Sequence, residues 1–170
     1  RQNTPQATIW RWRAAFQNDF AARIRWTQMP PAQANHAPLA VLNGMKGLQP
    51  IEVKACPGAP VMLSAGGSVD PDGGRLSYHW WWYRESGGLF SPDLTLSSDG
   101  GQTITAVVGG SAHTDQFAPP TAYKMHVILE VTDAGMPTLT SYRRAIITVP
   151  GASAPGASAE CSVKAIPPSH

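Results

Sequence analysis

The sequence predicts a mostly β protein in which two antiparallel sheets pack face to face, preceded by one amphipathic helix. Three observations predict this class. Short apolar runs with a period of two residues recur from residue 39 onward. Glycine and proline, 16 of each, separate these runs at hairpin-like intervals. Charged residues make up 14% of the chain, below the roughly 25% that is usual for soluble domains. Such a composition is typical of a turn-rich protein with few long helices.

The helix is predicted over the segment from Trp10 to Trp26. Its alanines favour helix formation, and large apolar side chains recur at every fourth position: Trp12, Phe16, Phe20 and Ile24. The segment also carries four arginines, namely Arg11, Arg13, Arg23 and Arg25. This pattern would suit a helix on a membrane surface, but two turns of large aromatics more often pack on protein. We therefore expect the aromatic side chains either to be buried on the sandwich or linker, or to form an apolar surface for another domain.

A linker and seven candidate strands follow the helix. Residues 29–38 contain three prolines, which remove backbone donors and fix backbone angles. The candidate strands are Leu39–Leu42, Ile51–Val53, Val61–Leu63, Leu76–Tyr83, Thr103–Val108, Tyr123–Val131 and Tyr142–Val149. Because no helical pattern separates them, two packed antiparallel sheets are favoured over a parallel α/β sheet. The predicted organisation is a helical segment over 1–28, a linker over 29–38, a sandwich over 39–150 and a flexible tail of small residues over 151–170.

The aromatic run Leu76–Tyr83 predicts which side chains enter the core. Alternate residues of a strand share a face. The set expected in the core is Leu76, Tyr78, Trp80 and Trp82. Trp81 and Tyr83 then point outward with His79 beside them, and outward aromatics need a cover. The cover is the chain's own helix, another domain or a sugar ring, so Trp81, Tyr83 and His79 are the candidate carbohydrate-binding residues.

Several segments resemble known families. Asp70–Gly73 (DPDG) followed by Leu76–Trp80 (LSYHW) resembles the signature of PKD and related immunoglobulin-like domains. Phe16–Arg23 (FQNDFAAR), taken with Ile128–Asp133 and Leu139–Arg144, resembles the C-terminal half of the cellulose-binding Sde182-like (DUF1593) family. This resemblance spans roughly residues 10–149. It implies an immunoglobulin/PKD-like sandwich in a secreted, periplasmic or cell-surface protein, with polysaccharide and a nucleoside-hydrolase-like N-terminal domain, missing from this chain, as partners.

Calcium is the one cofactor that the sequence suggests. Asp70 and Asp72 share a tight turn, and Asp133 could join them from the end of a strand, which would bring hard oxygen ligands together. The alternative is that these aspartates form side-chain-to-backbone bonds in their turns, as Asp before Gly often does. Gly74 stands where the PKD-like signature usually has an Asp, which weakens the calcium interpretation.

Neither the histidines nor the carboxylates form a recognisable catalytic pattern. His36 lies in the linker, and only His79 and His126 lie on predicted strands. Motifs such as GxSxG, HExxH or a phosphate-binding glycine loop do not occur. Glu130 is expected to form a cross-strand ion pair with Arg143 or Arg144. The sequence therefore predicts that this chain is not an enzyme, although a longer parent protein could carry a hydrolase-like domain.

Charge and cysteine content restrict the partners and the redox chemistry. The net charge is +2 and the basic residues form no stripe, which argues against nucleic acid. No apolar run approaches the roughly 20 residues that cross a bilayer, so no membrane partner is expected. Cys56 and Cys161 are either one disulfide, which an oxidising compartment would favour, or two unrelated thiols.

Two functions are compatible with these observations. One is a binding module that presents Trp81 and Tyr83 to a polysaccharide. The other is a structural companion that packs on a hydrolase-like domain through Trp10, Trp12, Phe16 and Phe20. The position of the aromatics distinguishes them, because a cover from the chain's own helix favours the structural role and an open planar row favours sugar binding.

Overall fold

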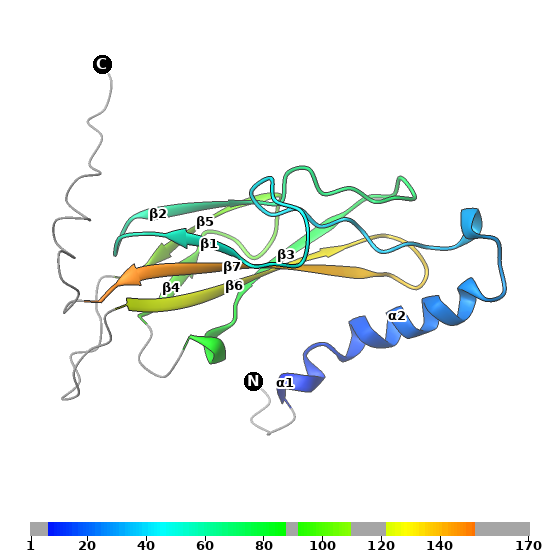
Figure 1. The fold of residues 1–170 in the computed structure, drawn as a ribbon, viewed down its shortest axis with the longest axis horizontal. Coiled ribbons are helices and arrows are strands. Elements are labelled where there is room, and N and C mark those ends of the chain that lie inside the picture. Colours follow the sequence, from blue (N-terminus) through cyan, green and yellow to red (C-terminus); the bar gives the residue numbers. More distant parts are fainter. Residues whose placement is uncertain (1–6, 88–91, 110–121, 152–170) are drawn as a thin grey trace, which may run out of the picture.

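The computed structural model describes residues 7–87, 92–109 and 122–151 and shows a two-layered β-sandwich with helices along one side (Figure 1). One sheet has four strands in the order β1-β7-β6-β3, and the other has three in the order β2-β5-β4. The strands are β1 (Ile51–Lys54), β2 (Pro60–Ser64), β3 (Ser77–Trp82), β4 (Leu94–Leu96), β5 (Thr103–Val108), β6 (Ala122–Thr132) and β7 (Thr140–Pro150). The predicted mostly β sandwich is confirmed.

The four-stranded sheet is built around the long hairpin of β6 and β7, whose register runs from Ala122 opposite Pro150 to Thr132 opposite Thr140. β3 pairs antiparallel with β6. β1 pairs parallel with β7, with Ile51 opposite Ala145. The prediction of purely antiparallel sheets is therefore wrong for the edge strand β1, which runs in the same direction as its neighbour β7.

Six of the seven predicted strands form, and the exception is Leu39–Leu42. This segment makes only isolated bridges, from Leu39 to Val69 and from Leu42 to Met45. Asn43 and Gly44, with φ of 48° and 76°, turn the chain back at once, as in a two-residue hairpin turn with positive φ at both positions. The sequence reading missed β4, which has only three residues and so shows almost no alternation.

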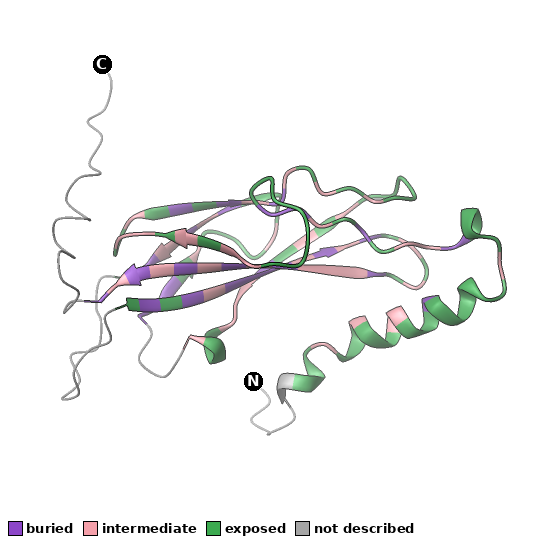
Figure 2. Ribbon diagram, in the orientation of Figure 1, coloured by how far each residue is buried: buried purple, intermediate pink, exposed green. Residues whose placement is uncertain are grey.

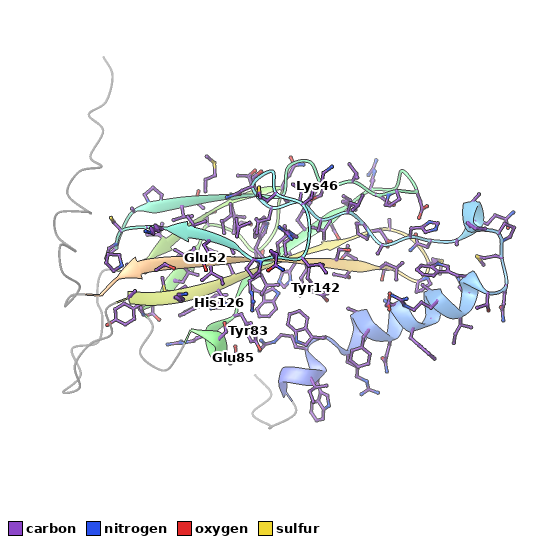
Figure 3. The ribbon with its side chains drawn as sticks, viewed as in Figure 1. Lys46, Glu52, Tyr83, Glu85, His126 and Tyr142 are labelled. Atoms are coloured by element: carbon purple, nitrogen blue, oxygen red, sulfur yellow. The ribbon has the colours of Figure 1, made fainter. Side chains whose placement is uncertain are left out.

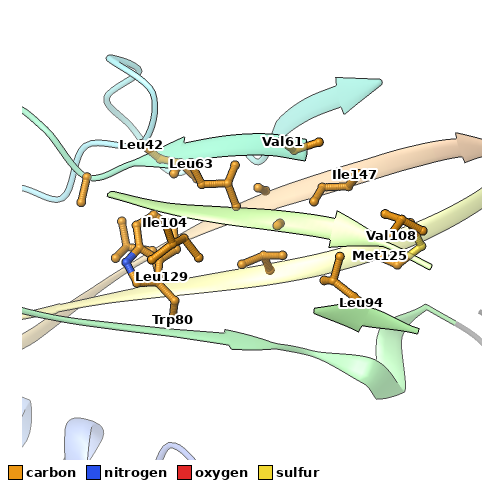
Figure 4. Packing of buried hydrophobic residues seen from close by; sticks show 14 of the residues in the cluster. Leu42, Val61, Leu63, Trp80, Leu94, Ile104, Val108, Met125, Leu129 and Ile147 are labelled. Atoms are coloured by element: carbon orange, nitrogen blue, oxygen red, sulfur yellow. The ribbon is translucent and has the colours of Figure 1, made fainter. Parts of the chain in front are cut away.

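The core lies between the two sheets and contains Leu63, Trp80, Ile104, Leu129 and Ile147 (Figure 4). Trp80 is 1% exposed, and its indole Nε1 donates to Gly101 O at 2.9 Å. The other inward members of the aromatic run, Leu76, Tyr78 and Trp82, are partly buried against this core. The predicted register of β3 is confirmed: Trp80 lies in the core and Trp81 does not.

The predicted single helix is two helices, α1 (Ala7–Trp10) and α2 (Arg13–Trp26). They are followed by the 3₁₀ turn η1 (Pro31–Gln33), and a second 3₁₀ turn, η2 (Arg84–Ser86), follows β3. The break falls at Trp12, which is the N-cap residue of α2. None of the helices in the described ranges is long and apolar enough to cross a membrane.

Helix α2 lies beside the β6–β7 hairpin with its small and polar side facing the hairpin (Figure 1). Ala22 is buried, Asn18 Nδ2 donates to Thr138 O at 3.0 Å, and Arg25 Nη1 donates to Met136 O at 2.8 Å. Figure 2 shows that most of α2 is exposed, and the large apolar side chains of the helix are among its exposed residues. Phe16, Phe20 and Ile24 are 51%, 65% and 46% exposed. The expected burial of Phe16 and Phe20 on the sandwich is therefore wrong, and these two rings belong to an exposed apolar surface instead.

Candidate functional site

The outer face of the four-stranded sheet carries a cluster of four aromatic side chains, Trp12, Trp81, Tyr83 and Tyr142, here called the outer aromatic cluster. Trp81 comes from β3, Tyr83 from the residue after it and Tyr142 from β7. Figure 3 labels Tyr83 and Tyr142 on the side of the sheet that faces the helices. The ring of Trp12 lies 5.4 Å from that of Trp81, 6.4 Å from that of Tyr83 and 4.9 Å from that of Tyr142. Edge contacts of this kind contribute about 0.5–1.5 kcal/mol per pair beyond area burial.

Trp12 lies at the break between α1 and α2 and is the N-cap residue of α2. Its backbone N–H donates to Ile9 O, and its own C=O accepts the N–H of Phe16. The contacts of its ring with Trp81 and Tyr142 anchor the start of α2 on the sheet.

Arg11 covers the same cluster. Its guanidinium carbon lies 4.7 Å from the ring centroid of Trp81 and 5.2 Å from that of Tyr83. Its Nη2 also forms a 2.7 Å ion pair with Glu85 in η2. Guanidinium groups favour the faces of aromatic rings in this way. Together Trp12 and Arg11 occupy the space in front of Trp81 and Tyr83, so these two rings form no open planar row.

Glu130 organises the polar edge of the cluster. Its Oε1 accepts a hydrogen bond from Trp81 Nε1 at 2.9 Å, and its Oε2 lies 3.1 Å from Nδ1 of His79. The expected ion pair with Arg143 or Arg144 is wrong, because the register places Glu130 opposite His79 and Tyr142. Arg143 is 4% exposed on the inward side of β7, where its Nη2 donates to Met45 O.

The titration behaviour of the outer face follows from burial. Burial, with a smaller effect of Glu130, raises the pKa of Tyr142 to about 12. The phenol is therefore neutral at physiological pH. Burial also lowers the pKa of His126 on the neighbouring strand β6. This imidazole is therefore neutral near pH 7. Neither Tyr142 nor His126 therefore adds a charge to the sheet at neutral pH.

The structure does not bring the three calcium candidates together. Asp70 Oδ1 accepts the N–H of Asp72 at 2.9 Å, which is the turn bond that the alternative interpretation describes. Asp72 Oδ2 accepts the N–H of His36 at 2.6 Å, and this bond is the main cause of its lowered pKa. Asp133 lies in a separate network. In the described part of the chain, no three His, Cys, Asp or Glu side chains are placed to hold a metal ion.

Asp133 joins the linker to the β6–β7 turn. It is 4% exposed, and its Oδ1 accepts the N–H groups of Gly135 at 3.1 Å and Leu139 at 2.8 Å. Its Oδ2 accepts Nδ2 of Asn35 at 2.8 Å. A Cβ at Gly135 would collide with the Asn35 amide. The sequence reading did not assign a role to Asn35, because its partners are distant in the sequence.

Two predictions concern residues that the structure does not describe. Cys161 lies outside the described ranges, so the proposed bridge to Cys56 stays a prediction. The tail predicted over 151–170 also lies outside these ranges, apart from Gly151.

Comparison with known proteins gives one family and one informative structure. Residues 60–149 match the family described as "Cellulose-binding protein Sde0182, C-terminal domain". The structure of a nucleoside hydrolase-related hypothetical protein from Saccharophagus degradans, associated with carbohydrate metabolism, aligns with a TM-score of 0.72 at 32% identity. The alignment covers 82% of this chain and 32% of that one, so this chain spans about a third of that relative.

A second solved structure supports no argument about this chain. Mouse clustered PcdhgC3 EC1-3 aligns with 66% of this chain and 33% of its own at 17% identity, and its TM-score of 0.34 is too low to support an argument. No curated protein sequence matches the chain significantly. Since the family match covers more than half of the residues and the fold agrees, the chain belongs to the family of the Sde0182 C-terminal domain.

Proposed function

We propose that this chain is a non-catalytic accessory module of a secreted or surface-located, carbohydrate-associated protein, and that it packs against a nucleoside hydrolase-related domain. The observation that carries the proposal is the exposed apolar stripe of α2, formed by Phe16, Phe20 and Ile24. A row of large apolar side chains on one exposed side of a helix is typical of a surface that another protein element covers.

The helix is held in a way that suits such a contact. Its start is anchored by Trp12 on the outer aromatic cluster, and its polar side is bonded to the β6–β7 hairpin through Asn18 and Arg25. The stripe is therefore presented on a fixed helix, and less conformational entropy is lost when a partner binds. The occupant we propose is a hydrolase-related domain, because the solved relative is described as nucleoside hydrolase-related and is about three times as long as the matched part.

Replacing Phe20 with Asp should separate the two domains. In a protein that joins this chain to its hydrolase-related domain, we expect the single thermal unfolding transition to split into two, because a charge would be buried in the interface. In this chain alone, the change should alter the free energy of unfolding by less than about 0.5 kcal/mol, since Phe20 is 65% exposed. Differential scanning calorimetry measures both quantities.

Gln17→Asp is the matched control, since Gln17 is an exposed neighbour on the same helix. It should leave the joined protein with one transition. Equal effects of the two substitutions, or a strongly destabilised isolated chain carrying Phe20→Asp, would contradict the proposed interface.

We also infer that the module contributes to carbohydrate binding, which the description of its family favours. Retention of the purified chain on insoluble cellulose and on other insoluble glycans tests this function. Trp81, Tyr83 and His79 remain candidates for the contact, although Trp12 and Arg11 would have to move away first. If this face binds, Trp12→Ala should raise retention and Trp81→Ala should lower it.

A further inference from the structure

A cavity of about 310 Å³ lies between the C-terminal end of α2, the linker and the β6–β7 turn. This volume is at the lower end of the range of about 300–1,000 Å³ found for small-molecule sites. The side chains relevant here are Arg25, Trp26, Gln33, Asn35, Asp72 and Met136. They come from the end of α2, the linker, the turn before β3 and the β6–β7 turn, so the cavity exists only when these four segments are folded together.

The walls of the cavity are fixed before any ligand arrives. Trp26 Nε1 donates to Asn35 O at 2.9 Å, and its ring stacks on His36 at 5.9 Å between centroids. Asn35 Nδ2 is bonded to Asp133 and to Pro137 O. Asp72 is held by His36. A pre-organised wall reduces the entropy lost on binding.

Polar groups at these walls retain hydrogen-bonding capacity. Asn35 uses its Nδ2 in both side-chain bonds, and within the described residues its Oδ1 accepts none. Gln33 is exposed and its side-chain amide forms no hydrogen bond to any described residue. Arg25 uses one of the five N–H donors of its guanidinium group to bond Met136 O. Arg25 and Gln33, which both line the cavity, therefore retain polar groups that form no bond to a described residue.

The charges identify the class of ligand. Arg25 contributes one positive charge, and Asp72, whose lowered pKa keeps it ionised at neutral pH, contributes one negative charge. A balanced pair favours a neutral ligand over an anion or a cation. Planar amide, carboxylate and guanidinium groups suit adjacent hydroxyls, while Trp26 and Met136 offer apolar surface to C–H groups.

We propose that this cavity binds a neutral mono- or disaccharide unit, such as the end of a glucan chain. The inference rests on the proposed carbohydrate-binding function and gives it a site away from the outer aromatic cluster. A concave cavity of this size cannot accept the flat face of crystalline cellulose. The module should therefore prefer chain ends, amorphous material and soluble oligosaccharides.

Titration of the isotopically labelled chain with cellobiose, followed by ¹H–¹⁵N NMR, tests the site. The indole N–H signal of Trp26 and the side-chain amide signal of Gln33 should shift, whereas that of buried Trp80 should not. Gln33→Ala should weaken binding about fivefold, as expected for one lost hydrogen bond of about 1 kcal/mol. Gln33→Trp, which fills the cavity from an exposed position, should abolish it.

Two controls locate the binding. Gln17→Ala makes the same chemical change elsewhere on the exposed surface and should leave the cellobiose affinity unchanged. Met62→Ala should also leave it unchanged, because Met62 is exposed on β2 and does not line the cavity. Larger shifts with inorganic phosphate than with cellobiose would overturn the assignment of a neutral sugar.

The outcomes separate the site from the function. If the chain is retained on glycans and Gln33→Trp is retained equally, the cavity is not the site, although the carbohydrate-binding function stands. If the chain neither binds cellobiose nor is retained on any glycan, both proposals fail.

Discussion

Replacing Trp80 with Ala should lower the free energy of unfolding by about 3–5 kcal/mol, the range expected for removing a buried large aromatic side chain. Trp80 is 1% exposed between the sheets. The truncation also removes the bond from its Nε1 to Gly101 O, which ties β3 to the segment before β5. Urea unfolding followed by circular dichroism measures the change.

Trp81→Ala is the matched comparison, because it removes the same side chain from the opposite face of the same strand. Trp81 is only partly buried, and its main contacts are Trp12, Tyr83 and Glu130. We expect a loss of about 1–2 kcal/mol, within the range of ordinary point substitutions. A larger loss for Trp81→Ala than for Trp80→Ala would mean that the register of β3 is wrong.

Replacing Asp133 with Ala should lower the free energy of unfolding by about 2–4 kcal/mol, because three donors lose their acceptor in a largely buried site. These donors are the N–H groups of Gly135 and Leu139 and the Nδ2 of Asn35. Since Asn35 also accepts the indole N–H of Trp26, the end of α2 should loosen as well. Hydrogen exchange at Trp26 and in the β6–β7 turn should therefore accelerate more than exchange in β5.

Asp70→Ala serves as the comparison, since Asp70 Oδ1 accepts one turn bond from Asp72. Its loss should cost about 0.5–1.5 kcal/mol, the usual net value of a single hydrogen bond. If Asp133→Ala were no more costly than Asp70→Ala, the role assigned to Asp133 would be wrong. If added Ca²⁺ stabilised the chain and each of these two substitutions removed that effect, the calcium interpretation would replace the turn interpretation.

The fold class and the register of β3 follow from the local pattern of the sequence. Neighbouring residues in a strand point to opposite faces of the sheet. When one face is buried, Trp80 and Trp81 must therefore lie on different sides, whichever strands pair with β3. The turn at Asn43 and Gly44 is also encoded by the local sequence, because few residues other than Gly and Asn adopt positive φ at low cost. The strand periods and turn residues therefore predicted most of the sandwich. They missed the short strand β4, the isolated bridges of Leu39–Leu42 and the parallel pairing of β1 with β7.

Tertiary structure alone decided the contacts of the candidate sites. The four-residue repeat of α2 showed which side of the helix is apolar, but it could not show that the opposite side, with Asn18 and Ala22, would face the hairpin. Glu130 meets Trp81 and His79 because of its cross-strand register. Trp12, at the start of α2, meets Trp81, Tyr83 and Tyr142. The cavity beside Trp26 is assembled from the end of α2, the linker, the turn with Asp72 and the β6–β7 turn. Local propensities do not encode such contacts, since they depend on how separate elements are oriented when the whole chain minimises its exposed apolar area.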